Sequence, residues 1–197
     1  MSLLDLRGKR LILASQSPRR AQLLRLLGLE FEVRNSGLVE ENHGPADPVE
    51  HVLALSRRKA EAVAAGVGEG YVVAADTIVV LDGEILGKPR DEAEAYAMLR
   101  RLSGRSHRVY TGFTVIEKPS GRSLSDFEVT DVHFRPLDDE EIWAYIRTGG
   151  PMDKAGAYGI QDLSAIFADR IVGCFYNVVG FPLAKWYQRM RDFVAGS

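Results

Sequence analysis

The 197-residue sequence contains a single cysteine, Cys174, so an internal disulfide is excluded. This scarcity is typical of proteins from a reducing compartment. The opening segment MSLLDLRGKR has no apolar run long enough for a signal peptide, and no segment reaches the ~18 apolar residues of a membrane span. We therefore expect a soluble, cytoplasmic protein with no membrane partner, in which Cys174 is a small core residue.

The sequence also lacks an excess of charge of either sign. Its 25 Lys and Arg residues are nearly balanced by 27 Asp and Glu residues, which leaves a formal net charge of −2. A protein of this charge has no general attraction for polyanions, so we expect no nucleic-acid polymer as a partner. Any binding of phosphate chains must come from local groups of lysine and arginine.

Several common catalytic motifs are missing as well. The histidines show no spacing typical of zinc ligands. The chain has neither a Walker phosphate loop nor a dinucleotide-binding glycine fingerprint, and its early serines lack the nucleophile elbow of a serine hydrolase. The function must therefore be sought in other groupings of residues.

The segment LILASQSPRR is the first such grouping. Its apolar residues Leu11–Ala14 predict a short buried strand, and Ser17 followed by Pro18 predicts the start of a helix. Arg19 and Arg20 then fall in the first helical turn, where the helix dipole disfavours cations unless an anion is bound. The segment is either a phosphate cradle or a capped surface helix with two solvated arginines.

Helix and strand signals alternate through the first half of the chain, and a long hairpin follows. We expect an α/β protein with a mixed β-sheet, forming one domain over residues 1–197. Strands are expected at residues 11–14, 31–33, 71–81, 84–86, 107–117, 124–134 and 165–172, and helices at residues 18–27, 48–65, 91–102, 138–147 and from Pro182 onward.

Asp76 interrupts YVVAADTIVVL, the most apolar strand signal in the chain. A carboxylate in such a strand is costly unless it is paired, hydrogen-bonded or bound to a metal. The alternative is an acid at a strand end that is solvated or caps a turn. The apolar residues on both sides favour a functional acid, acting as a metal ligand or as a general base.

The helix expected at residues 48–65 has an apolar stripe formed by Val52, Leu55 and Ala62. Lys59 lies on or beside the opposite face. Read alone, Lys59 is therefore expected at the surface.

The remaining charged residues are uninformative one by one, because most exposed lysines, arginines and glutamates are only solvated. Together with Asp76 they supply oxygen ligands for a hard cation and positive charge for a polyphosphate. That combination is typical of metal-assisted phosphate hydrolysis, in which positioning and charge neutralisation do most of the catalysis. The acids are Glu40 and Glu41, and the cations are Arg19, Arg20, Lys59, Lys88 and Lys154.

Five segments stand out together, namely SQSPRR at Ser15–Arg20, ADT at Ala75–Thr77, GKPRD at Gly87–Asp91, DKAGAYGIQ at Asp153–Gln161 and NVVGFPL at Asn177–Leu183. In this order they closely resemble the motifs of the Maf family of nucleoside triphosphate pyrophosphatases, also called septum formation inhibitors. The resemblance runs from about Leu11 to the final helix. Five motifs in the right order are far more specific than any one of them alone.

The resemblance implies a long, bent, mixed β-sheet with flanking helices and two lobes around a cleft, as in inosine-triphosphate pyrophosphatases. It also implies a divalent metal, Mg²⁺ or Mn²⁺, and a homodimer. Asp76 matches the presumed proton acceptor of the family and would hold the metal with Glu40, for which Glu41 is a one-residue alternative. The family's phosphate-binding residues fall on Ser15, Arg19, Arg20, Lys59 and Lys88.

The resemblance further implies a substrate preference. Arg, Thr and Gln at the positions of Arg19, Thr77 and Gln161 mark the dTTP/UTP branch, whereas the 7-methyl-GTP branch has Trp in place of the first arginine. Glutamine offers a donor and acceptors, so Gln161 can read a pyrimidine edge. One departure is Asp162, where relatives commonly carry glycine, and it leaves the preference among UTP, dTTP and modified uridines open.

We therefore expect a house-cleaning enzyme that hydrolyses dTTP and UTP to the monophosphate and pyrophosphate. One alternative is a nucleotide-binding regulator of septum formation with little catalysis, which needs the Ser15–Arg20 cradle but not Asp76. Another is a pyrophosphatase for deaminated purines, which Thr77 and Gln161 disfavour only through the family match.

Overall fold

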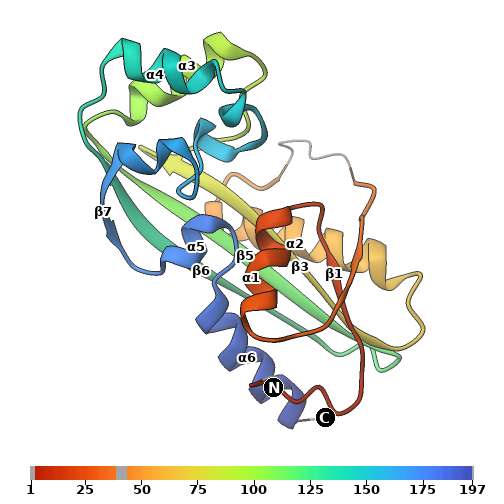
Figure 1. The fold of residues 1–197 in the computed structure, drawn as a ribbon. Helices are drawn as coiled ribbons and strands as arrows, with labels where there is room; N and C mark the ends of the chain where they lie inside the picture. The colour runs from red at the N-terminus through yellow and green to blue at the C-terminus, as the bar shows by residue number, and fades with distance from the viewer. Residues whose placement is uncertain (1–2, 39–43, 197) are drawn as a thin grey trace. The chain divides into compact units, whose positions relative to one another are not determined.

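Strand β3, Gly70–Leu81, is the longest apolar element of the computed structural model, which describes residues 3–38 and 44–196. The chain forms two compact units, and β3 contributes to both (Figure 1). Unit 1 comprises Met1–Asp76, Thr111–Glu128 and Gly180–Ser197, and unit 2 comprises Thr77–Tyr110 and Val129–Val179. The expected α/β fold with a mixed sheet is confirmed, whereas the single domain over residues 1–197 stays a prediction.

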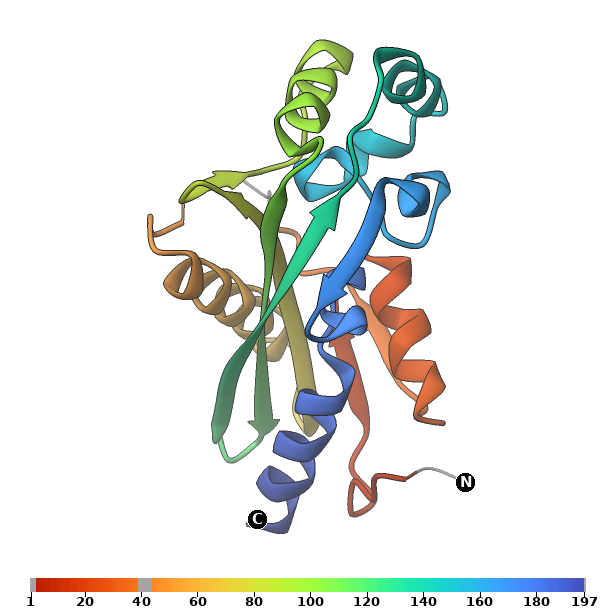
Figure 2. The same cartoon turned by 90° about the vertical axis from the view of Figure 1, so that its left-hand side faces the viewer.

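Unit 1 is built on the strand order β2-β1-β3-β5-β6, in which β1 is Leu11–Ala14, β2 Glu32–Arg34, β5 Ser106–Lys118 and β6 Ser123–Phe134. Both β2 and β3 run parallel to β1. Helices α1, Pro18–Leu26, and α6, Leu183–Ala195, cover one face of the sheet, and α2, Pro48–Ala64, covers the other (Figure 1 and Figure 2).

The alternation of side chains along β3 explains this layering. Val72 and Ala74 point to the α2 face and pack in one buried cluster with Ala60 and Val63 of α2. Tyr71 points to the opposite face, where its ring meets Phe193 of α6 edge-on at 6.3 Å between centroids. Because both faces are covered, β3 reads as a nearly continuous apolar run instead of an alternating one.

Unit 2 is built on the strand order β4-β3-β5-β6-β7, with β4 at Glu84–Leu86 and β7 at Ala168–Val172. The β3–β4 hairpin turns at Asp82-Gly83, where both residues have positive φ, as expected for this dipeptide. The α-helices are α3, Glu92–Leu102, α4, Asp139–Ile146, and α5, Phe175–Val179, and the short 3₁₀ segments are η1, Gly150–Asp153, η2, Ala155–Ala157, and η3, Leu163–Phe167.

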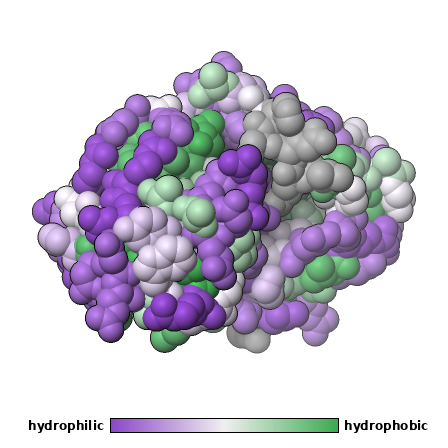
Figure 3. Space-filling view, turned by 90° about the horizontal axis from the view of Figure 1, so that it is seen from above, coloured by the Kyte–Doolittle hydropathy of each residue, from purple (hydrophilic) through white to green (hydrophobic). Residues whose placement is uncertain are grey.

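The local sequence explains where α3 and α4 begin. Asp91 accepts a hydrogen bond from the backbone N–H of Glu94, and Asp138 forms a capping box with Glu141. In the view of Figure 3, from above that of Figure 1, hydrophobic side chains form small separate areas among hydrophilic ones. The apolar faces of α3 and α4 pack onto the core of unit 2.

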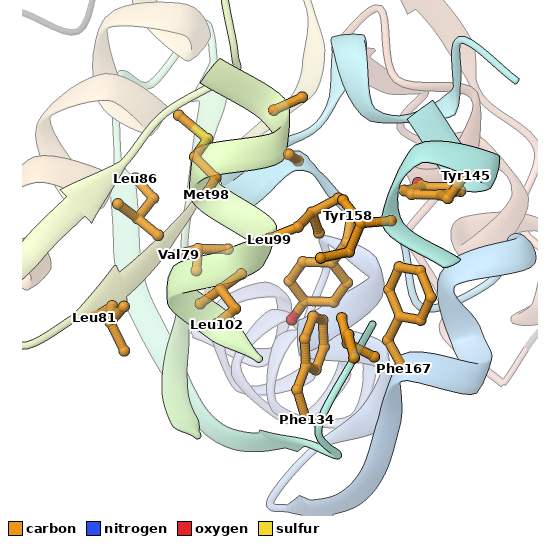
Figure 4. Close-up of a cluster of buried hydrophobic side chains, with 14 of the residues drawn as sticks. Val79, Leu81, Leu86, Met98, Leu99, Leu102, Phe134, Tyr145, Tyr158 and Phe167 are labelled. Carbon is orange, nitrogen blue, oxygen red and sulfur yellow. The ribbon is translucent and has the colours of Figure 1, made fainter. Parts of the chain in front are cut away.

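An aromatic cluster forms much of that core (Figure 4). Phe134, Tyr158 and Phe167 meet in edge-on ring contacts, and side chains of α3 pack against them. His107 of β5 is buried in the same cluster, with Nε2 2.8 Å from the Tyr158 hydroxyl oxygen. Burial, helped by the nearby His133, lowers the pKa of His107 to about 4, so its imidazole is neutral at pH 7.

In its secondary structure and at Cys174, the structure differs from the sequence predictions. Residues 165–167, expected to begin a strand, lie in η3, and β7 starts only at Ala168. The short helix α5 was not predicted, because its five residues are too few for a helical pattern. Cys174 is partly exposed, so its reading as a core residue is wrong. Across residues 3–38 and 44–196, no helix combines the length and apolarity needed to cross a membrane.

Replacing His107 with glutamine should weaken the dependence of the free energy of unfolding on pH. In the native protein His107 takes up a proton only near pH 4, whereas in the unfolded chain it does so near pH 6.5. Below about pH 6.5 the unfolded state therefore binds more protons, and stability falls with decreasing pH by up to about 1.4 kcal/mol per unit. Urea denaturation between pH 7 and pH 4 measures the slope, and equal slopes in both proteins would contradict the prediction.

Candidate functional site

Asp76 and Lys59 form a buried ion pair in unit 1. Asp76 lies on the face of β3 that α2 covers, and Lys59 reaches it from α2, with 2.7 Å between Nζ and Oδ1. Each residue is only 7% exposed. The expected functional acid thus lies in an apolar strand with an ammonium group as its partner.

The position of Lys59 corrects the sequence-based expectation. Lys59 lies in the buried row of α2 with Val52, Ser56 and Val63, whereas Ala62, assigned to the apolar stripe, is exposed. The row follows the helical spacing of three and four residues, but a charged residue within it does not register as apolar. The methylene groups of lysine can pack in such a row when its ammonium group finds a partner, here Asp76.

A buried ion pair of this kind is rarely kept for stability. Removing two charges from water costs several kcal/mol per ion, and apolar replacements of similar volume are often neutral or stabilising. Sequences break the local rules of folding mainly at functional sites. The pair between Lys59 and Asp76 therefore marks the centre of the candidate site.

The segment after β1 forms a second part of the site in unit 1. Leu13 of β1 pairs with Val73 of β3, so Ser15, two residues further on, lies level with Ala75, next to Asp76 in the chain. The Ser15 hydroxyl oxygen accepts hydrogen bonds from the Ser17 backbone N–H at 3.1 Å and from a guanidinium nitrogen of Arg20 at 3.3 Å. Extended by two residues, the parallel register thus brings this cradle to the height of Asp76 along the strands, with Ser15 on the α1 face of the sheet and the ion pair on the α2 face.

Arg20 is buried, so the reading of two solvated arginines on a surface helix is wrong for this residue. Its Nε donates to the backbone carbonyl of Gly180 at 2.9 Å, while NH1 donates to Ser15. Arg19 is half-buried. Ser17 occupies the N-cap position of α1 as expected, although its side chain makes no capping hydrogen bond.

Gly180, in the NVVGFPL segment, has a structural role that the sequence analysis did not predict. It has φ of +120°, a conformation that side chains rarely adopt, and it presents its carbonyl to Arg20. The next residue, Phe181, is fully buried and contacts Phe113 and Trp186 with ring centroids 6.3 and 5.5 Å away. This packing fixes the backbone that orients the guanidinium group.

Thr77, Lys88 and Gln161 belong to unit 2. Thr77 is half-buried, and Lys88 and Gln161 are exposed. The loops that carry Lys88 and Gln161 are joined by a hydrogen bond from the Gly156 N–H to the Gly87 carbonyl, at 3.0 Å. Two of the five motifs, GKPRD and DKAGAYGIQ, are therefore held together within this unit.

Lys154 does not serve as an open phosphate ligand in this structure. Its ammonium group lies 2.5 Å from the Gly150 carbonyl oxygen and 2.6 Å from a carboxylate oxygen of Asp153, and its side chain is 13% exposed. It instead stabilises the loop that leads to Gln161.

Of the proposed metal ligands, Asp76 lies in the part of the chain that the structure describes. Within residues 3–38 and 44–196, no group of three or more His, Cys, Asp and Glu side chains could hold a metal ion. The proposed ligand Glu40 and its alternative Glu41 lie outside the described residues. Mg²⁺ is commonly bound by one or two carboxylates together with substrate phosphates, so a lone Asp76 carboxylate fits such an ion.

Comparison with solved structures places the fold. A HAM1 protein from Coxiella burnetii matches 93% of this chain and 99% of its own, with a TM-score of 0.51 and 16% sequence identity. At this identity the likeness concerns the fold alone, a mixed α/β sheet with flanking helices.

Comparison of sequences identifies the family to which the chain belongs. The family model described as Maf-like protein matches residues 10–193, and the chain belongs to the Maf family. A protein of Thermococcus onnurineus named dTTP/UTP pyrophosphatase is 54% identical over 93% of this chain and 98% of its own. A protein of the same name from Carboxydothermus hydrogenoformans is 52% identical, also over 93% and 98%.

Replacing Arg20 with lysine should weaken the binding of inorganic tripolyphosphate about tenfold, which corresponds to about 1.4 kcal/mol. A lysine ammonium cannot reproduce the planar fork through which Arg20 contacts Gly180 and Ser15 at once. Titration calorimetry measures the dissociation constant. Arg25→Lys, an exposed change on the same helix, serves as the control, and equal affinities of both variants would refute the cradle.

Proposed function

We propose that this protein is a nucleoside triphosphate pyrophosphatase that hydrolyses dTTP and UTP, and modified uridine triphosphates, between the α and β phosphates. The observation that carries the proposal is the buried Lys59–Asp76 pair at the level of the Ser15–Arg20 cradle. Membership of the Maf family and relatives that are named dTTP/UTP pyrophosphatase support it. The proposed role is house-cleaning of the nucleotide pool.

In the reaction we propose, a water oxygen attacks the α-phosphorus. The bond from that phosphorus to the bridging oxygen breaks, and its electron pair leaves with pyrophosphate. Asp76 accepts the proton of the water or holds the water in line, and the Lys59 ammonium, 2.7 Å away, fixes the orientation of the carboxylate. Hydrolysis at this position yields the nucleoside monophosphate.

The phosphate chain needs positive charge, because negative charge accumulates on the leaving pyrophosphate. Ser15 and the cations donate hydrogen bonds to phosphate oxygens in the proposal, and the buried guanidinium group of Arg20 is held ready by Gly180. An interaction already oriented costs no reorganisation during the reaction. The proposed phosphate-binding residues are Ser15, Arg19, Arg20, Lys59 and Lys88.

A divalent cation, Mg²⁺ or Mn²⁺, is the proposed cofactor, held by Asp76 and by Glu40 or Glu41. When bound, it supplies charge neutralisation for the triphosphate. We further propose that Arg19, Thr77 and Gln161 select the base, with the Gln161 amide reading the pyrimidine edge. The proposed setting is a cytoplasmic, single-domain homodimer.

Replacing Asp76 with asparagine should lower kcat for dTTP by about 10²- to 10⁴-fold, the range for loss of a general base. Asparagine keeps an oxygen acceptor for Lys59, so circular dichroism should show an intact fold. Asp126→Asn removes a carboxylate that pairs with Arg189 in the same unit and serves as the matched control. Near wild-type turnover in Asp76→Asn would overturn the role of Asp76.

The substrate assignment is tested by pyrophosphate release from a panel of triphosphates with Mg²⁺, with and without EDTA. The proposal predicts fast turnover of dTTP and UTP that EDTA abolishes, and slow turnover of 7-methyl-GTP and ITP. If no triphosphate were hydrolysed although binding was intact, the protein would be a nucleotide-binding regulator instead.

A further inference from the structure

We propose that Asp162 is a specificity-determining positioning residue, which holds the turn that carries Gln161 and thereby sharpens selection of the pyrimidine base. The inference rests on the proposed function, and all the contacts that carry it lie within unit 2. Gln161 is exposed near the tip of a tight turn from Gly159 to Asp162, closed by a hydrogen bond from the Asp162 N–H to the Gly159 carbonyl at 3.0 Å.

One oxygen of the Asp162 carboxylate fastens the turn to η3. Oδ1 accepts from the backbone N–H of Ser164 at 2.9 Å and lies 2.7 Å from its hydroxyl oxygen. The Ser164 hydroxyl also lies 2.9 Å from the Gly159 carbonyl oxygen and accepts from the Gly159 N–H at 3.0 Å. Ser164 is fully buried, so both ends of the turn are tied to one anchor beneath the surface.

The other oxygen fastens the turn to two further segments. Oδ2 accepts from the Tyr145 hydroxyl of α4 at 3.0 Å and lies 3.4 Å from the Lys154 ammonium nitrogen. Burial and the negative charge of Asp162 raise the pKa of Tyr145, which keeps its hydroxyl protonated as a donor. The carboxylate therefore connects α4, the segment at Lys154 and η3, all from a position next to Gln161.

The packing at Gly159 shows how closely these groups fit. A Cβ atom added there would lie 2.6 Å from Cε of Lys154 and 2.9 Å from Oδ2 of Asp162. Both distances are too short for atoms that do not share a bond, so the turn backbone lies directly against the ion pair. A turn held in this way needs no ordering of its backbone when its side chain binds a base, which favours the base whose edge that side chain matches.

Glycine at position 162 is the comparison that shows what the Asp162 carboxylate contributes. Glycine has no carboxylate and permits more backbone conformations, so neither η3 nor Lys154 would hold the turn from that position. The proposal therefore concerns the selectivity of this particular chain, whereas the chemistry at the phosphates is independent of Asp162.

The test compares Asp162→Gly and Asp162→Asn with wild type for dTTP, for dCTP and for inorganic tripolyphosphate, which has no base. We expect the ratio of kcat/KM for dTTP to that for dCTP to fall about tenfold in Asp162→Gly, through a higher KM for dTTP. The ratio for Asp162→Asn, which keeps an acceptor for Ser164, should lie between those of wild type and Asp162→Gly. The affinity for tripolyphosphate should not change in either variant. Asp169→Asn, at a carboxylate 2.6 Å from His133, is the control.

A double-mutant cycle shows whether Asp162 acts through Gln161. The ratio in the combined variant Gln161→Ala with Asp162→Gly should equal that in Gln161→Ala alone. Additive losses, an unchanged ratio in Asp162→Gly, or an equal loss for tripolyphosphate would overturn the inference. If the wild type hydrolysed no triphosphate, the proposed function would fall and this inference with it, so the two failures are distinguishable.

Discussion

The ion pair between Lys59 and Asp76 is the constraint on which the candidate site in unit 1 depends. Its atoms lie 2.7 Å apart, with both residues almost fully buried between α2 and β3. Breaking such a pair from one side costs about 3–5 kcal/mol, because it leaves a buried charge uncompensated. The helix must therefore present Lys59 at the one position from which it reaches Asp76, and the parallel register of β1 and β3 then sets the level of Ser15.

Backbone groups orient two of the candidate side chains, Arg20 in unit 1 and Gln161 in unit 2. The Gly180 carbonyl accepts a hydrogen bond from Arg20, which is 160 positions away in the sequence. Gln161 lies on a turn of unit 2 that a backbone hydrogen bond closes. Both depend on glycines: Gly180 for its φ of +120°, and Gly159 for the close approach of Lys154. Preorganised donors of this kind need no rearrangement when negative charge develops on a substrate.

Much of the fold could be predicted from the sequence because its signals are local. Asp91 and Asp138 cap helices where expected, and Asp82-Gly83 forms the hairpin. The predictions that were wrong concern residues whose environment is set by tertiary contacts. Lys59 was read as exposed because its partner is 17 positions away, and the 3₁₀ segment η3 depends on contacts that no short pattern contains. Asp76 was identified only because its neighbours are so apolar.

The most direct test of the account replaces the pair with apolar residues, in the double variant Lys59→Met with Asp76→Leu. If the pair is kept for function at the expense of stability, urea denaturation should give a free energy of unfolding equal to wild type or up to about 4 kcal/mol higher. Hydrolysis of dTTP should be lost in the same protein. A double variant destabilised by several kcal/mol would show that the pair is structural, and one that retained turnover would contradict the central claim.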